Sequence, residues 1–212
     1  MKKYLAEAIG TFALVFCGTG AIIINNETGG TVTHVGIAIT FGLVVIAMIY
    51  TFGDISGAHI NPAVSIGFAL TDRFSKRDLM PYIIAQLMGA FAASGVLKLL
   101  FPMDKTLGST LPFDTAMQSF ILEIILTYFL MLVILFVSQN EKVSHFTGFA
   151  VGGTVLLEAL FAGPITGASM NPARSIAPAF VSGHLESVWI YIFATIIGAV
   201  LASFTWRYFE DV

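Results

Sequence analysis

The sequence predicts an all-α membrane protein with six transmembrane helices and two re-entrant half-helices. Three observations lead to this fold class. The 212 residues are 57% hydrophobic and only 11% charged, and a soluble domain with so few charges could not cover its surface. The apolar residues form continuous runs rather than the alternating pattern of barrel strands. Two further apolar runs are short, and each follows an Asn-Pro-Ala triplet.

Six apolar segments are long enough to cross a bilayer, whose hydrocarbon core needs about 20 residues of helix. They cover roughly residues 4–25, 33–53, 79–101, 117–138, 145–163 and 187–208. The first could be mistaken for a cleaved signal peptide, but its apolar run is longer than a signal core and contains Glu7. We therefore expect a retained first span and one transmembrane domain over residues 1–212.

The lysine and arginine residues predict the orientation. If six spans alternate, most basic residues fall on the side of both termini, and Lys105 alone lies in a loop on the other side. The residues on the first side are Lys2, Lys3, Arg73, Lys76, Arg77, Lys142 and Arg207. The positive-inside rule then places both termini in the cytoplasm of a multi-pass protein of the cell membrane, inner or plasma.

The two halves of the chain repeat each other, over approximately residues 4–101 and 117–208. Glu7 and Thr11 in the first span match Glu123 and Thr127 in the fourth, with the same spacing. Each half holds three spans, which is an odd number, so the halves must have inverted orientations.

Each half also carries one Asn-Pro-Ala triplet, which is a helix-start signal. Asparagine is a favoured N-cap, and proline suits the first helical position because an N–H there would be unpaired anyway. The apolar runs that follow, 64–70 and 175–181, are too short to span a membrane. Two such half-helices, each about 13 Å long, would enter from opposite faces and together cross roughly 30 Å. The triplets are Asn61, Pro62, Ala63 and Asn171, Pro172, Ala173.

The meeting point of the half-helices has a predictable chemistry. Each helix N-terminus carries about half a positive charge. As N-caps, Asn61 and Asn171 would accept backbone N–H bonds through their side-chain oxygens and keep each amide NH₂ free to donate into the junction. Such a site favours neutral oxygen-bearing molecules and repels cations.

These motifs resemble the major intrinsic protein family, the aquaporins and aquaglyceroporins. The resemblance covers essentially the whole chain and rests on residues 6–7, 10–11, 56–63 and 167–175 with Pro178. It implies an hourglass pore in each subunit of a homotetramer, embedded in the lipid bilayer. The expected function is a passive channel for water and small neutral solutes that excludes protons and ions. We expect no enzymatic activity, no cofactor, no metal site and no nucleic-acid partner.

The family sets its selectivity at an outer constriction, whose four positions fall here on Phe41, Ala159, Ala168 and Arg174. Arginine would add a fixed cation beside the passing solute. Water-only members resemble one another in having histidine at the position of Ala159, so we expect a wider and less polar opening. Typical glycerol facilitators have aspartate where Ser175 stands. Residues 150–173 look most like plant nodulin-type intrinsic proteins, which pass water, glycerol and neutral metalloid acids, and we expect a multi-solute pore.

Buried ionisable residues complete the set of candidates. Glu7 and Glu123 lie in apolar spans, where we expect each to support a re-entrant loop by accepting backbone N–H bonds, rather than to relay protons. Glu158 adjoins a filter position and has no counterpart in the first half; it could pair with polar groups behind the filter or titrate as a gate. His59 could line the pore or act as a protonation gate.

Other functions remain open at this point. A water-selective channel is the nearest alternative. A secondary transporter also uses inverted repeats and broken helices, but would need a coupling-ion site, and no acidic cluster lies at the expected midplane. An intramembrane enzyme would need a nucleophile with a base or a metal set, and none is visible in the sequence.

Overall fold

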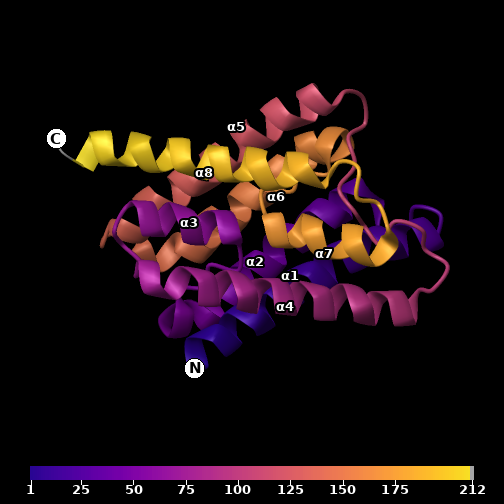
Figure 1. Ribbon diagram of the computed structural model, residues 1–212, viewed down its shortest axis with the longest axis horizontal. Helices are drawn as coiled ribbons and strands as arrows, with labels where there is room; N and C mark the ends of the chain where they lie inside the picture. The colour runs from indigo at the N-terminus through magenta and orange to yellow at the C-terminus, as the bar shows by residue number, and fades with distance from the viewer. Residues whose placement is uncertain (211–212) are drawn as a thin grey trace.

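Six long helices form the body of the molecule in the computed structural model, which describes residues 1–210 (Figure 1). Each is long and apolar enough to cross a membrane, which confirms the six predicted spans. A 3₁₀ turn, Ser144–Phe146, leads into the fifth of them. The six are α1 (Lys2–Glu27), α2 (Thr33–Ser56), α4 (Lys76–Leu100), α5 (Ala116–Gln139), α6 (Thr147–Thr166) and α8 (Val188–Glu210).

Two short helices, α3 (Pro62–Leu70) and α7 (Pro172–Ser182), lie between the long ones. Figure 1 shows them end to end along the molecule, with α8 on one side and α4 on the other. The helices that precede them end at Gly57 and Gly167, whose φ angles of 83° and 81° lie in the left-handed region. Glycine adopts this conformation without strain, so α2 and α6 stop and the chain turns back toward the interior. The predicted re-entrant half-helices are therefore present.

Both halves of the molecule contain a close helix crossing at a glycine. Helix α1 crosses α4, and α5 crosses α8, at glycines that leave no room for a side chain. A Cβ atom on Gly89 would lie 2.0 Å from the carbonyl oxygen of Ala8, and one on Gly198 would lie 2.4 Å from that of Ile124. These two glycines thus bring helix backbones into direct contact.

The outer surface of the helix bundle is apolar. Large hydrophobic side chains are exposed on several long helices, among them Leu43, Leu157, Phe193 and Phe204. Polar side chains, in contrast, are gathered in the interior around the two short helices. An apolar exterior around a polar interior is the arrangement of a multi-pass membrane protein.

Candidate pore and selectivity filter

The triplet asparagines cap the two short helices. Asn61 Oδ1 accepts the backbone N–H of Ala63 at 2.8 Å, and Asn171 Oδ1 accepts those of Ala173 and Arg174 at 3.0 and 3.3 Å. Proline occupies the first helical position in both cases. The helix-start signals in the sequence therefore act locally, as N-caps do in any helix.

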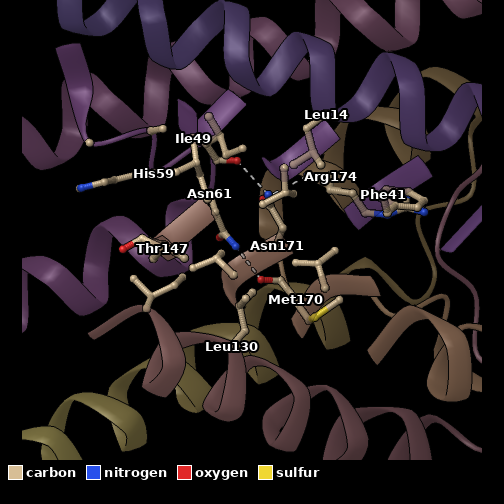
Figure 2. A pocket seen from close by; sticks show the side chains of 18 of the residues that line it. Leu14, Phe41, Ile49, His59, Asn61, Leu130, Thr147, Met170, Asn171 and Arg174 are labelled. Carbon is tan, nitrogen blue, oxygen red and sulfur yellow. Dashed lines mark hydrogen bonds between the residues drawn. The ribbon is translucent and has the colours of Figure 1, made fainter. Parts of the chain in front are cut away.

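The asparagine amides also join the two half-helices to each other. Asn61 Nδ2 donates to the carbonyl of Met170 at 2.7 Å, and Asn171 Nδ2 donates to the carbonyl of Ile60 at 2.9 Å (Figure 2). This corrects the expectation that both hydrogens of each amide are free. One hydrogen of each holds the opposite loop, because the half-helices meet so closely that a loop carbonyl lies within reach. An amide has two N–H donors, so one per asparagine is left over.

The loops before the caps have an unusual backbone, repeated in both halves. Ala58 and Ile60 have φ angles of 47° and 44°, and Ala168 and Met170 have 41° and 54°. Residues other than glycine seldom adopt positive φ, and a β-branched residue such as isoleucine is an outlier there. Such conformations cost of order 1–3 kcal/mol each and persist only where neighbouring groups hold them.

Glu7 holds the first loop. Its Oε1 accepts the hydroxyl of Ser56 at 2.7 Å and the N–H of His59 at 2.9 Å. Its Oε2 accepts the N–H of Ile60 at 2.7 Å and the amide of Gln86 at 2.7 Å. Four donors thus surround a carboxyl group that is fully buried, so the loop's backbone N–H groups are satisfied where lipid could not satisfy them.

Glu123 holds the second loop in the same way. Its Oε1 accepts the hydroxyl of Thr166 at 2.7 Å and the N–H of Ser169 at 2.8 Å, and its Oε2 accepts the N–H of Met170 at 2.9 Å. His59 and Ser169 are therefore equivalent positions, as are Ile60 and Met170. The matched contacts extend the inverted repeat from the helices to the loops.

A cavity of about 100 Å³ runs past the two asparagines (Figure 2). Its lining is mostly apolar, with Leu14 and Leu130 among the side chains that surround the triplets. Toward the side of the chain termini it is lined by Ser138 and Thr147, and toward the other side by the four predicted filter residues. A space of this size holds several water-sized molecules.

Phe41, Ala159, Ala168 and Arg174 all line this cavity, although they come from α2, α6, the second loop and α7. The guanidinium carbon of Arg174 lies 5.0 Å from the centre of the Phe41 ring. Arg174 Nη1 donates to the carbonyl of Gly108 at 2.8 Å, while its Nε is buried with no hydrogen-bond partner in residues 1–210. The hydrogen bond to Gly108 and the face of the Phe41 ring thus orient the Arg174 side chain, which is 1% exposed.

Ala159 and Ala168 line the same cavity with a side chain of only one methyl group each. Neither can donate a hydrogen bond from its side chain. The polar groups at this level therefore belong to Arg174 and the backbone.

His59 lines the cavity near the first loop, with its ring packed among aromatic rings. The centroids of Phe68, Phe74 and Tyr82 lie 4.7, 4.8 and 5.2 Å from it. Its Nδ1 lies 3.0 Å from the hydroxyl of Ser65. Figure 2 shows the ring pointing away from the two asparagines.

Glu158 does not lie on the cavity wall. It is buried, and its Oε2 has no hydrogen-bond partner within residues 1–210. The expected pairing with polar groups behind the filter is therefore not seen for this atom. Ala159, the next residue on the same helix, lines the cavity instead.

Sequence reasoning missed several polar side chains that complete the site. Gln86 Nε2, from α4, donates to Ser65 Oγ at 3.0 Å as well as to Glu7. In the second half, Ser175 Oγ is bonded to Ser169 Oγ at 2.6 Å and to Thr110 Oγ1 at 2.8 Å. A glutamine in an apolar span was a usable signal for Gln86, but no local pattern marks Thr110.

The sequence comparisons identify the family. Residues 1–206 match the family described as major intrinsic protein. The chain belongs to the major intrinsic protein family. Nodulin-26 of Glycine max is 45% identical over 209 residues, which is 98% of this chain and 77% of that protein. Aquaporin NIP1-1 of Zea mays is 46% identical over 210 residues, covering 98% and 74% of the two chains.

A solved structure agrees with these relatives of the major intrinsic protein family. The X-ray structure of the aquaglyceroporin from Plasmodium falciparum superposes with a TM-score of 0.88 at 27% sequence identity. The superposition covers 97% of this chain and 94% of the aquaglyceroporin chain. The fold is therefore the hourglass fold expected from the sequence, and the chain is a membrane channel for water and small neutral solutes. Family members and relatives with these names are channels rather than enzymes.

Proposed function

We propose that this channel conducts glycerol, urea and neutral metalloid acids as well as water. The observation that carries the proposal is the pair of alanines that line the cavity together with Phe41 and Arg174. A side chain of one methyl group leaves room that an imidazole would fill, and it imposes no hydrogen bond on the solute. The similarity to nodulin-26 and to an aquaglyceroporin supports a filter of this wider class.

Solutes would cross by exchanging hydrogen bonds with a few fixed donors. Arg174 supplies N–H donors at the filter, and Asn61 and Asn171 each supply one remaining amide hydrogen at the midplane. The apolar side chains elsewhere on the wall offer no competing bonds. A neutral molecule with several oxygens can therefore pass from donor to donor.

Cations, protons included, would be excluded by positive charge. The N-termini of α3 and α7 meet at the asparagines, and each carries about half a positive charge. Arg174 adds a full charge at the outer end. Because no carboxylate of residues 1–210 lines the cavity, no acidic side chain on the wall offsets this positive charge for a cation.

The other candidate residues take supporting roles in this proposal. Glu7 and Glu123 keep the strained loops in place through the bonds described above. His59 is a packing and lining residue of the first loop, since its ring is enclosed by three aromatic rings. Glu158 supports the filter helix from behind.

We further propose that the channel works as a homotetramer with one pore per subunit, in the cell membrane and with both termini in the cytoplasm. The basic residues support this orientation, because Lys3, Arg73, Lys76 and Arg207 lie at the helix ends nearest the termini. The exposed apolar side chains are available both to lipid and to neighbouring subunits.

The test is stopped-flow light scattering of proteoliposomes that contain the purified protein, with gradients of sucrose, glycerol and urea. We expect rapid water efflux and measurable entry of glycerol and urea above the rates of empty liposomes. Water permeation with both larger solutes excluded would refute the wide filter and favour the water-selective alternative. Saturable uptake that collapses with a protonophore would indicate a secondary transporter instead.

A further inference from the structure

The loop between α4 and α5 carries the carbonyl that holds the filter arginine. Among residues 1–210, the carbonyl of Gly108 is the one protein hydrogen-bond acceptor of the Arg174 guanidinium, at 2.8 Å. The position of this carbonyl therefore determines where the guanidinium lies in the pore. A loop is mobile unless something ties it down, so the question is what fixes Gly108.

Asp104 organises the turn that leads to Gly108. Its Oδ1 accepts the backbone N–H of Leu107 at 2.7 Å and that of Thr106 at 3.0 Å. Its Oδ2 faces Asn26 Nδ2 of α1 at 3.4 Å. Asp104 is 7% exposed, so these bonds are shielded from water. A carboxylate that accepts several donors closes a turn more firmly than a neutral group does.

The turn needs this support because its backbone is strained. Leu107 and Gly108 have φ angles of 50° and 67°, and positive φ is unfavourable for leucine. The Leu107 side chain is completely buried against Ile23 and Leu97. One side of the turn is thus anchored by apolar packing, and the other by the Asp104 carboxylate.

The turn also packs closely against α1 at Gly108, where a side chain would not fit. A Cβ atom on Gly108 would lie 2.8 Å from Thr19 Cβ and 3.1 Å from the Thr19 carbonyl oxygen. Two residues further on, Thr110 Oγ1 donates to Ser175 Oγ, which belongs to the half-helix that carries Arg174. The carbonyl of Gly108 is therefore held between α1 and α7.

We propose that Asp104 is a positioning residue for the selectivity filter: by fixing the turn at residues 106–108, it holds the Gly108 carbonyl against Arg174 and so sets the width of the outer pore. This inference rests on the proposed function, since it assigns Arg174 to the filter. Without a side-chain oxygen at position 104 the turn relaxes, the carbonyl moves away, and the guanidinium loses its fixed place beside Phe41.

The experiment compares glycerol-to-water permeability ratios in proteoliposomes for the wild type and for Asp104→Ala, Asp104→Asn, Arg174→Val and the double variant Asp104→Ala/Arg174→Val. We expect Asp104→Ala to change the ratio at least about threefold, in the direction that Arg174→Val changes it. Asp104→Asn keeps an oxygen that can accept the Thr106 and Leu107 N–H groups, so it retains the wild-type ratio. In the double variant, Asp104→Ala should add nothing to the effect of Arg174→Val.

The matched control is Asp114→Ala, in the same loop, because Asp114 is exposed and its loss should leave the ratio unchanged. The proposal is overturned if Asp104→Ala leaves the ratio unchanged, or if it changes the ratio equally with and without Arg174. If Arg174→Val itself has no effect on the ratio, the filter assignment fails rather than the role of Asp104. If Asp104→Ala does not fold, two other variants provide the comparison: Asn26→Leu removes the Asn26 amide donor to Asp104, and Thr106→Pro removes the Thr106 N–H and hydroxyl donors. An unchanged ratio in both overturns the proposal.

Discussion

In the proposed function, the two alanines of the candidate filter set which solutes the pore admits. Ala159 and Ala168 lie on the cavity wall together with Phe41 and Arg174, and they contribute neither bulk nor hydrogen bonds. Because the arginine is held at one place by Gly108, the width of the opening depends chiefly on these small side chains. A single substitution on this wall should therefore change which solutes pass.

Replacing Ala159 by histidine should convert the channel toward water selectivity. The imidazole adds bulk and a hydrogen-bonding group at the narrowest level, so we expect glycerol flux to fall at least about tenfold while water flux falls much less. Stopped-flow measurements on matched proteoliposomes, normalised to the amount of reconstituted protein, report both fluxes. Equal losses of glycerol and water flux would show that position 159 does not discriminate between solutes.

Residues outside the cavity also belong to the site, and these are the least predictable from sequence. The triplets could be assigned to helix starts, because an asparagine cap and a following proline act on their own helix. The bonds from Asn61 to Met170 and from Arg174 to Gly108 could not, since they join segments 109 and 66 positions apart. Contacts of this kind depend on the tertiary packing alone.

At the scale of the helices, the filter depends on how α1 and α2 pack. Gly18 of α1 lies directly against the ring of Phe41, and a Cβ atom there would be 2.2 Å from the nearest ring carbon. The absence of a side chain at Gly18 thus provides the space in which the ring sits. The glycine controls the pore without lining it.

Substituting Gly18 by alanine should narrow the filter. The new methyl group would overlap the Phe41 ring, which lines the cavity. We expect the ring to shift into the cavity, so that glycerol flux falls more than water flux. The control is Gly153→Ala on α6, where a Cβ atom meets nothing within 4 Å. If both variants show the same glycerol-to-water ratio as the wild type, the ring has another way to relax.

The half-helices themselves could be predicted from the sequence almost completely. The expected runs, 64–70 and 175–181, lie inside α3 and α7, which begin at the triplet prolines as the capping signals require. The long helices extend beyond the predicted spans by one to three residues at most ends, because helices continue through the polar boundary of a membrane while hydropathy does not. The loop at 102–115 had no periodicity to interpret, and its role emerged only from its contacts with α1 and α7.

At the scale of the whole molecule, the inverted repeat supplies the junction of the pore with equivalent contacts from both halves. Glu7 and Glu123 hold equivalent strained loops, Gly89 and Gly198 allow equivalent helix crossings, and the two asparagines bond across the midplane. Each half therefore supplies one half-helix and one loop to a junction that neither could build alone. Static packing of this kind suits a channel better than a transporter that must rock between states.

The proposed assembly can be measured in detergent. Light scattering coupled to size-exclusion chromatography, corrected for bound detergent, should give a protein mass about four times the chain mass of 22.8 kDa. A mass equal to one chain, with full permeability retained after reconstitution, would contradict the tetramer and leave the single-subunit pore intact.

The central claim is that water and larger neutral solutes share one conduit, which passes Ala159 on its way to the paired asparagines. The most direct measurement places a cysteine at Ala159, in a background where the single native Cys17 is replaced by serine, and treats proteoliposomes with a small neutral thiol reagent. The control is Asp114→Cys, which places an exposed thiol in the loop between α4 and α5. With labelling quantified by mass spectrometry, we predict that water and glycerol flux both fall in proportion to the labelled fraction at position 159 and stay constant at position 114. Complete labelling at position 159 with either flux unchanged would contradict the shared conduit.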